Sequence, residues 1–212
     1  MRRMPVPSRR EAARILQSLD PPAWSTRHAC AVADVAAWLA REAVRHGATV
    51  DVHAVEAAAL LHDVDKVVGR PSDVRHADGS AAWLESHGLA ELAPLVRDHP
   101  VTRLADDDET ARLMAAPLEA RIVAYADKRA GQRLETMDDR FASWRHRYPA
   151  GPAETPTGDP VPGKRGWDHE LADRVYERAL ALERDVCDAA GVTPRDVQRL
   201  RWSRAALIGA AR

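Results

Sequence analysis

Ionisable side chains lie on the otherwise apolar faces of several predicted helices, and this feature constrains the fold more than any other. Apolar residues recur at helical spacing in segments 25–46, 51–63, 90–98 and 117–137. The ionisable side chains on these faces are His28, His62, His99 and Asp127. Such groups are rarely buried unless they are paired or bind a metal. The helices are therefore expected to pack around one shared polar site.

The composition indicates an all-α protein that forms a single domain over residues 1–212. The chain has 212 residues, of which 45% are apolar, with only one Phe and three Tyr. Small and branched side chains must therefore form the core, which favours packed helices over sheets. The length suits one domain with a substantial core. We expect a bundle of about seven or eight helices.

Capping residues and helix breakers set the expected boundaries. A first helix should follow Ser8 and end near Leu19, and the others are expected at 25–46, 51–63, 78–87, 90–98, 117–137 and 168–210, the last interrupted before Thr193. Segment 101–116 is expected to be a solvated connection that contains at most one helical turn. Residues 149–166 hold five Pro and four Gly, which indicates an irregular loop.

Charge and cysteine content limit the binding partners and cellular locations to be expected. A formal net charge of −1 gives no global attraction for nucleic acid or for an anionic membrane. Cys30 and Cys187 form no disulfide framework. No apolar stretch approaches the roughly 18 residues of a membrane span, and no secretory signal is recognisable. We expect a soluble, cytoplasmic protein, and a homo-oligomer is compatible with the sequence.

The buried polar site has the residue types of a metal centre. Imidazole nitrogens with a carboxylate suit Zn, Fe, Mn, Co or Ni, which the sequence does not distinguish, whereas magnesium suits three histidines poorly. Asp63 has two oxygens and could bridge to a second ion held by His76 and His99. One or two divalent ions that activate water and polarise phosphate would make a hydrolase. The alternative is a buried hydrogen-bond network, with His99 capping its helix and His76 on the surface.

These residues, in this order, resemble the signature of the HD-domain metal-dependent phosphohydrolases. The family signature of a His, an adjacent His-Asp pair and a later Asp matches His28, His62 with Asp63, and Asp127. His76 and His99 fall where the two-metal branch has its added histidines. The resemblance covers about residues 24–135 and implies an HD-domain helical bundle. It differs at Asp65, where family members often have glycine.

The resemblance implies hydrolysis of a phosphoric ester or phosphoanhydride in a small phosphorylated substrate, either nucleotide-like or another metabolite. Asp63 and Lys66 are the expected catalytic residues. Lys66, Arg129 and Arg133 are expected to bind the substrate phosphate, although the two arginines could instead form surface ion pairs with Glu135 and Asp138. Trp24 is expected to be a core or inter-helix anchor.

Two other functions fit the same residues. The myo-inositol oxygenase-like branch uses six such ligands for oxygen chemistry at a di-iron centre, and it would consume oxygen with a polyol-type substrate. A nucleotide-sensing module would bind its ligand without turnover, with metal coordination completed by protein.

Overall fold

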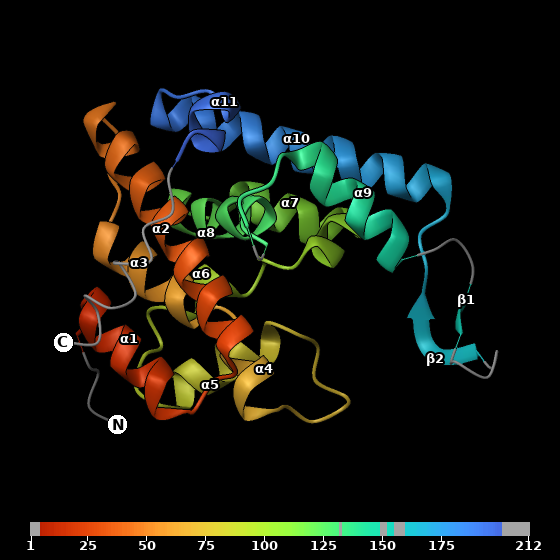
Figure 1. Cartoon of the computed structure of the whole chain (residues 1–212), viewed down its shortest axis with the longest axis horizontal. Helices are drawn as coiled ribbons and strands as arrows, with labels where there is room; N and C mark the ends of the chain where they lie inside the picture. The colour runs from red at the N-terminus through yellow and green to blue at the C-terminus, as the bar shows by residue number, and fades with distance from the viewer. Residues whose placement is uncertain (1–4, 132, 149–151, 155–159, 201–212) are drawn as a thin grey trace.

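Helix α2 (Ala23–Arg45) packs against α3 (Val52–Leu61), α8 (Leu118–Arg129) and α10 (His169–Ala190) (Figure 1). The computed structural model describes residues 5–131, 133–148, 152–154 and 160–200, with the backbone alone for 152–154 and 160–165. Val32, Val35 and Leu39 of α2 are buried on the predicted apolar face. The predicted all-α class is confirmed.

The described residues contain eight helices of nine or more residues, in line with the prediction of about seven or eight. Besides α2, α3, α8 and α10 these are α1 (Arg9–Ser18), α5 (Asp78–Ser86), α7 (Asp107–Ala115) and α9 (Met137–Arg147). Shorter elements are α4 (Val64–Val68), α6 (Ala93–Val96), α11 (Pro194–Gln198) and the 3-10 helix η1 (Val101–Ala105). None of the described helices is long and apolar enough to cross a membrane.

Side-chain caps begin several helices where the sequence predicts them. Ser8 accepts a hydrogen bond from the Glu11 backbone N–H before α1, and Asp168 accepts one from the Leu171 N–H before α10. Thr193 forms a capping box with Asp196 before α11. Each cap satisfies a backbone donor that the first helical turn leaves unpaired.

The prediction of one helix over 117–137 is wrong beyond Arg129. Helix α8 ends at Arg129, because Ala130 adopts an extended conformation and pairs with Leu134 in an isolated bridge. Thr136 then caps α9 by accepting from the Asp139 backbone N–H. The chain thus turns just beyond Asp127, and a separate helix covers the turn.

Two other segments differ from expectation, and a third is described only in part. Residues 101–116 are largely helical as η1 and α7, since Asp106 caps α7 through the Glu109 backbone N–H. Within 149–166, β1 (Pro152–Glu154) and β2 (Pro160–Arg165) pair antiparallel at one end of the molecule, so part of the expected loop is ordered by backbone hydrogen bonds (Figure 1). The predicted helical span 168–210 is observed through α11, and its last ten residues lie outside the described part.

Candidate metal centre

Six ligand-type side chains from five parts of the chain converge beside α2. His28 comes from α2, His62 and Asp63 follow α3, and Asp127 comes from α8. His76 lies in the loop after α4, and His99 lies after α6. His62, Asp63 and His99 are buried, whereas the side chains of His76 and Asp127 keep 23% and 14% of their surface exposed. The cluster therefore has an open side near those two residues.

The two oxygens of Asp63 divide the cluster into two groups. Asp63 Oδ2 lies 3.4 Å from His28 Nε2 and 3.6 Å from His62 Nε2, and Asp63 Oδ1 lies 3.1 Å from His76 Nε2 and 3.3 Å from His99 Nε2. Asp127 Oδ1 joins the first group, 3.2 Å from His28 Nε2 and 3.6 Å from His62 Nε2. Each group could hold one ion, with the Asp63 carboxylate between them.

The other ring nitrogen of each histidine faces an oxygen. The Nδ1 atom of His62 is 2.8 Å from the Ala59 carbonyl oxygen, and that of His99 is 2.7 Å from the Val96 carbonyl oxygen. His28 Nδ1 lies 3.4 Å from the Gly131 carbonyl oxygen. A carbonyl can only accept, so Nδ1 carries the proton and the Nε2 lone pair of a neutral ring points into the cluster. Metal-binding histidines are commonly oriented in this way.

The cluster attracts positive charge. Burial lowers the pKa of His28, but the contacts with Asp127 and Asp63 outweigh burial and raise this pKa to about 10. Burial raises the pKa of Asp63, but the surrounding histidines outweigh it and hold that pKa well below its usual range. Burial lowers the pKa of His99 to about 4, so this ring stays neutral near pH 7. A divalent cation would meet the same attraction as a proton.

The residues present fit such a cation. Asp63 Oδ1 is buried and accepts no hydrogen bond from the part of the chain that the structure describes. His28 Nε2 is 3.1 Å from His62 Nε2, and His99 Nε2 is 3.2 Å from His76 Nε2. A divalent ion within each group would serve the facing ring nitrogens and the buried carboxylate oxygen together, in place of the proton that the raised pKa assigns to His28.

His76 is held by Asp65. The His76 Nδ1 atom lies 3.0 Å from Asp65 Oδ1 and 3.1 Å from Asp65 Oδ2, and the backbone N–H of Ala77 donates to Asp65 Oδ2 at 3.1 Å. Ala77 has a φ of +71°, a conformation that costs an L-residue energy. Buried Arg103 donates to the His76 carbonyl oxygen and pairs with Asp78. These contacts together fix the orientation of the His76 imidazole.

Lys66 reaches the cluster from its open side. Its Nζ atom is 2.8 Å from Asp63 Oδ2, and the side chain is 37% exposed. Lys66 therefore lies where an anionic ligand could approach the cluster.

The structure does not bring the two predicted arginines into the cluster. All three guanidinium nitrogens of Arg129 are engaged, with Glu183, Tyr125, Gln198 and backbone carbonyl oxygens, and the residue is buried. Arg133 pairs with Glu135 across 3.4 Å and is 79% exposed. The phosphate-binding prediction is wrong for Arg129, since no donor remains, and Arg133 fits the alternative of a surface ion pair.

Sequence reasoning missed the contact of Asp65 with His76 and misplaced Trp24. The only signal for Asp65 was its departure from the glycine often found in the resembled family. Trp24 is 44% exposed, so the expectation of a core anchor is wrong for this residue. Its position after Pro21 and Pro22 places it in the first turn of α2, where no described helix covers it.

The comparisons with known proteins identify one match. A family model described as HD domain matches residues 26–131, half of the 212-residue chain. No curated protein and no solved structure matches the sequence significantly.

Proposed function

The chain belongs to the HD-domain family, and on this basis we propose that it is a metal-dependent hydrolase of phosphoric esters or phosphoanhydrides in a small phosphorylated metabolite, with nucleotides among the candidates. The observation that carries the proposal is the division of the Asp63 oxygens between two groups of ligand-type side chains. The proposed ligands are His28, His62, Asp63 and Asp127 for one ion, and Asp63, His76 and His99 for a second.

A divalent transition metal bound there would lower the pKa of a water molecule and polarise a phosphate oxygen. The protein residues would hold the metal ligands in place and bind the substrate phosphate. The backbone carbonyls behind His62 and His99 keep the rings fixed, which avoids reorganisation during the reaction. Lys66 would exchange its contact with Asp63 for a phosphate oxygen and offset part of the substrate charge.

Removal and return of metal test this proposal. Protein treated with a chelator should form no hydrolysis product from a panel of phosphomonoesters, phosphodiesters and nucleotides, measured as phosphate from the monoesters and nucleotides and as the freed alcohol from the diesters. Reloading with Mn²⁺ or Fe²⁺ should restore hydrolysis, whereas Mg²⁺ should restore little, because it coordinates histidines poorly. Elemental analysis should give two ions per chain after reloading.

Two outcomes would contradict the proposal. Iron-dependent oxygen uptake with a polyol and no phosphate release would indicate an oxygenase. Tight nucleotide binding by metal-loaded protein, without product release from any substrate on the panel, would indicate a sensing module.

Asp65→Asn is expected to lower the affinity of the protein for the second ion. The amide keeps the shape but lacks the charge that orients His76, and loss of such an outer partner typically lowers metal affinity about 10- to 100-fold. Metal titration should show one site near wild-type affinity and one weakened site. Asp73→Asn, which alters an exposed aspartate of the same loop, is the matched control. Equal weakening of both sites would contradict a specific role for Asp65 at His76.

A further inference from the structure

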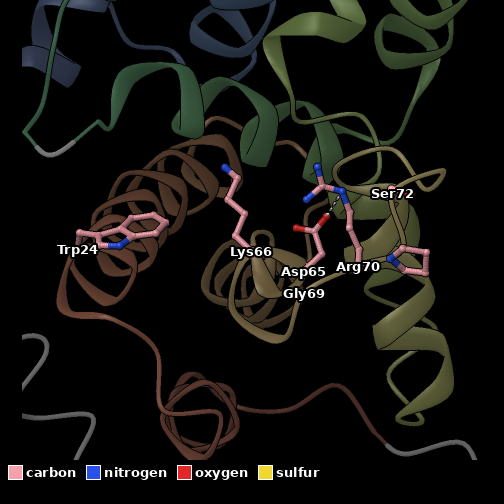
Figure 2. Close-up of a pocket in the computed structure, with 7 residues that line it drawn as sticks. Trp24, Asp65, Lys66, Gly69, Arg70 and Ser72 are labelled. Atoms are coloured by element: carbon pink, nitrogen blue, oxygen red, sulfur yellow. Dashed lines mark ion pairs between the residues drawn. The ribbon is translucent and has the colours of Figure 1, made fainter. Parts of the chain in front are cut away.

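A pocket of about 510 Å³ opens beside the candidate metal centre (Figure 2). The residues that line it come from the first turn of α2, from α4 and from the following loop: Trp24, Asp65, Lys66, Gly69, Arg70, Pro71 and Ser72. Lys66 belongs to both places, because it lines the pocket while its Nζ atom contacts Asp63 Oδ2 at 2.8 Å. A pocket of this volume suits a small molecule larger than phosphate alone.

The charged groups of the pocket favour an anion. In Figure 2 the side chains of Lys66 and Arg70 extend in the same direction. The carboxylate of Asp65 is already engaged with His76 and the Ala77 N–H, and it lies 3.8 Å from Arg70 Nε. Arg70 Nε donates to the Val74 carbonyl oxygen, which holds the guanidinium at the pocket. Both cations thus lie near the cluster, Lys66 in contact with Asp63 and Arg70 beside Asp65, the partner of His76.

The opposite wall of the pocket is aromatic. Trp24 is the one aromatic side chain among the exposed large hydrophobic residues of the described part of the chain, the others being Val44 and Val68. Its indole faces the space between α2 and α4 (Figure 2). A rigid aromatic surface at low entropic cost is suited to stacking against another flat ring.

Resting on the proposed function, we propose that this pocket is the subsite for the leaving group of the substrate. The leaving group carries a planar aromatic ring that stacks on Trp24, as the base of a nucleotide would. The phosphate from which this group departs reaches Lys66 and the metal centre, and Arg70 contacts the same anion. Trp24 thus determines specificity between phosphate esters with an aromatic ring and those without one.

Two substrates that differ only in the ring test the subsite. Hydrolysis of adenosine 5′-monophosphate and of ribose 5-phosphate should be compared for wild-type protein, Trp24→Leu and Trp24→Phe, each loaded with Mn²⁺. Trp24→Leu should raise KM for the nucleotide about tenfold, because the stacking contact with the base is lost. KM for ribose 5-phosphate should stay unchanged, and Trp24→Phe should retain most of the nucleotide preference because the ring remains.

Failure of the subsite and failure of the proposed function give different results. If both substrates are hydrolysed and Trp24→Leu affects them equally or not at all, the subsite is wrong and the hydrolase remains. If neither is hydrolysed, equilibrium binding of adenosine 5′-monophosphate and ribose 5-phosphate to the same proteins decides. Tighter nucleotide binding that is lost in Trp24→Leu would support the subsite without turnover, and equal binding of both compounds would overturn it.

Discussion

Asp63→Asn is expected to abolish metal binding at both positions and to lower phosphate release by a factor of about 1,000 or more, equivalent to about 4 kcal/mol in the activation barrier. Asp63 is the proposed ligand shared by both groups, and the asparagine side chain offers one oxygen in place of two. Its amide N–H groups would also donate to the Nε2 atoms that otherwise face the carboxylate. The variant side chain would thus satisfy the cluster without a cation.

Elemental analysis and a phosphate-release assay on the same preparations measure this effect. The content should fall from two ions per chain to less than one, while circular dichroism should show unchanged helix content because the substitution alters no packed volume. Asp73→Asn removes the same charge from an exposed position and should behave as wild type. Retention of both ions and of turnover in Asp63→Asn would remove the basis for the proposed ligand set.

Four ligand-type residues stand at helical spacing from apolar neighbours, and this spacing is a local property of the sequence. His28 and Asp127 lie on α2 and α8, and His62 and His99 come just after α3 and α6. The apolar face of each helix packs on the core whatever the details of the bundle. His76 is different, since it lies in a loop and only its order in the family signature pointed to it. Its contact with Asp65 could not be predicted, because it depends on how the loop after α4 places His76 beside that residue.

The end of α8 shows why helix boundaries are less predictable. The apolar spacing of Val123 and Leu134 suggests one continuous helix. In the structure the Thr136–Asp139 capping box begins a new helix instead, and α9 packs against α8 and α10. Sequence spacing contains no information on that packing.

The burial of Arg129 depends on residues far away in the sequence. Its partner Glu183 lies 54 positions later on α10, and the two are joined by an Arg129 Nη1 to Glu183 Oε2 contact of 2.8 Å. Tyr125 donates its hydroxyl to the same Glu183 oxygen at 2.7 Å. From the sequence, an arginine two residues after a ligand is equally compatible with a substrate contact. Only the placement of α10 over α8 shows that this arginine is structural.

Glu183→Ala is therefore expected to destabilise the protein by about 3 kcal/mol or more, because it leaves the Arg129 guanidinium buried without its counter-ion. For a chain of this length such a loss lowers Tm by roughly 6–12 °C. Glu170→Ala on the same helix is the matched control. Glu170 is 87% exposed and lies 3.6 Å from Arg174, so its loss should change the free energy of unfolding by less than about 0.5 kcal/mol.

Thermal unfolding and metal content together separate a structural Arg129 from a substrate-binding one. Glu183→Ala should unfold at lower temperature yet keep both ions and its KM when assayed well below its Tm, since the pair is engaged with Tyr125 and Gln198. Replacing Arg129 and Glu183 together with methionine should cost less than the sum of the two single replacements, because no unpaired charge remains buried. An unchanged Tm with a raised KM would instead assign Arg129 to the substrate, as the sequence first suggested.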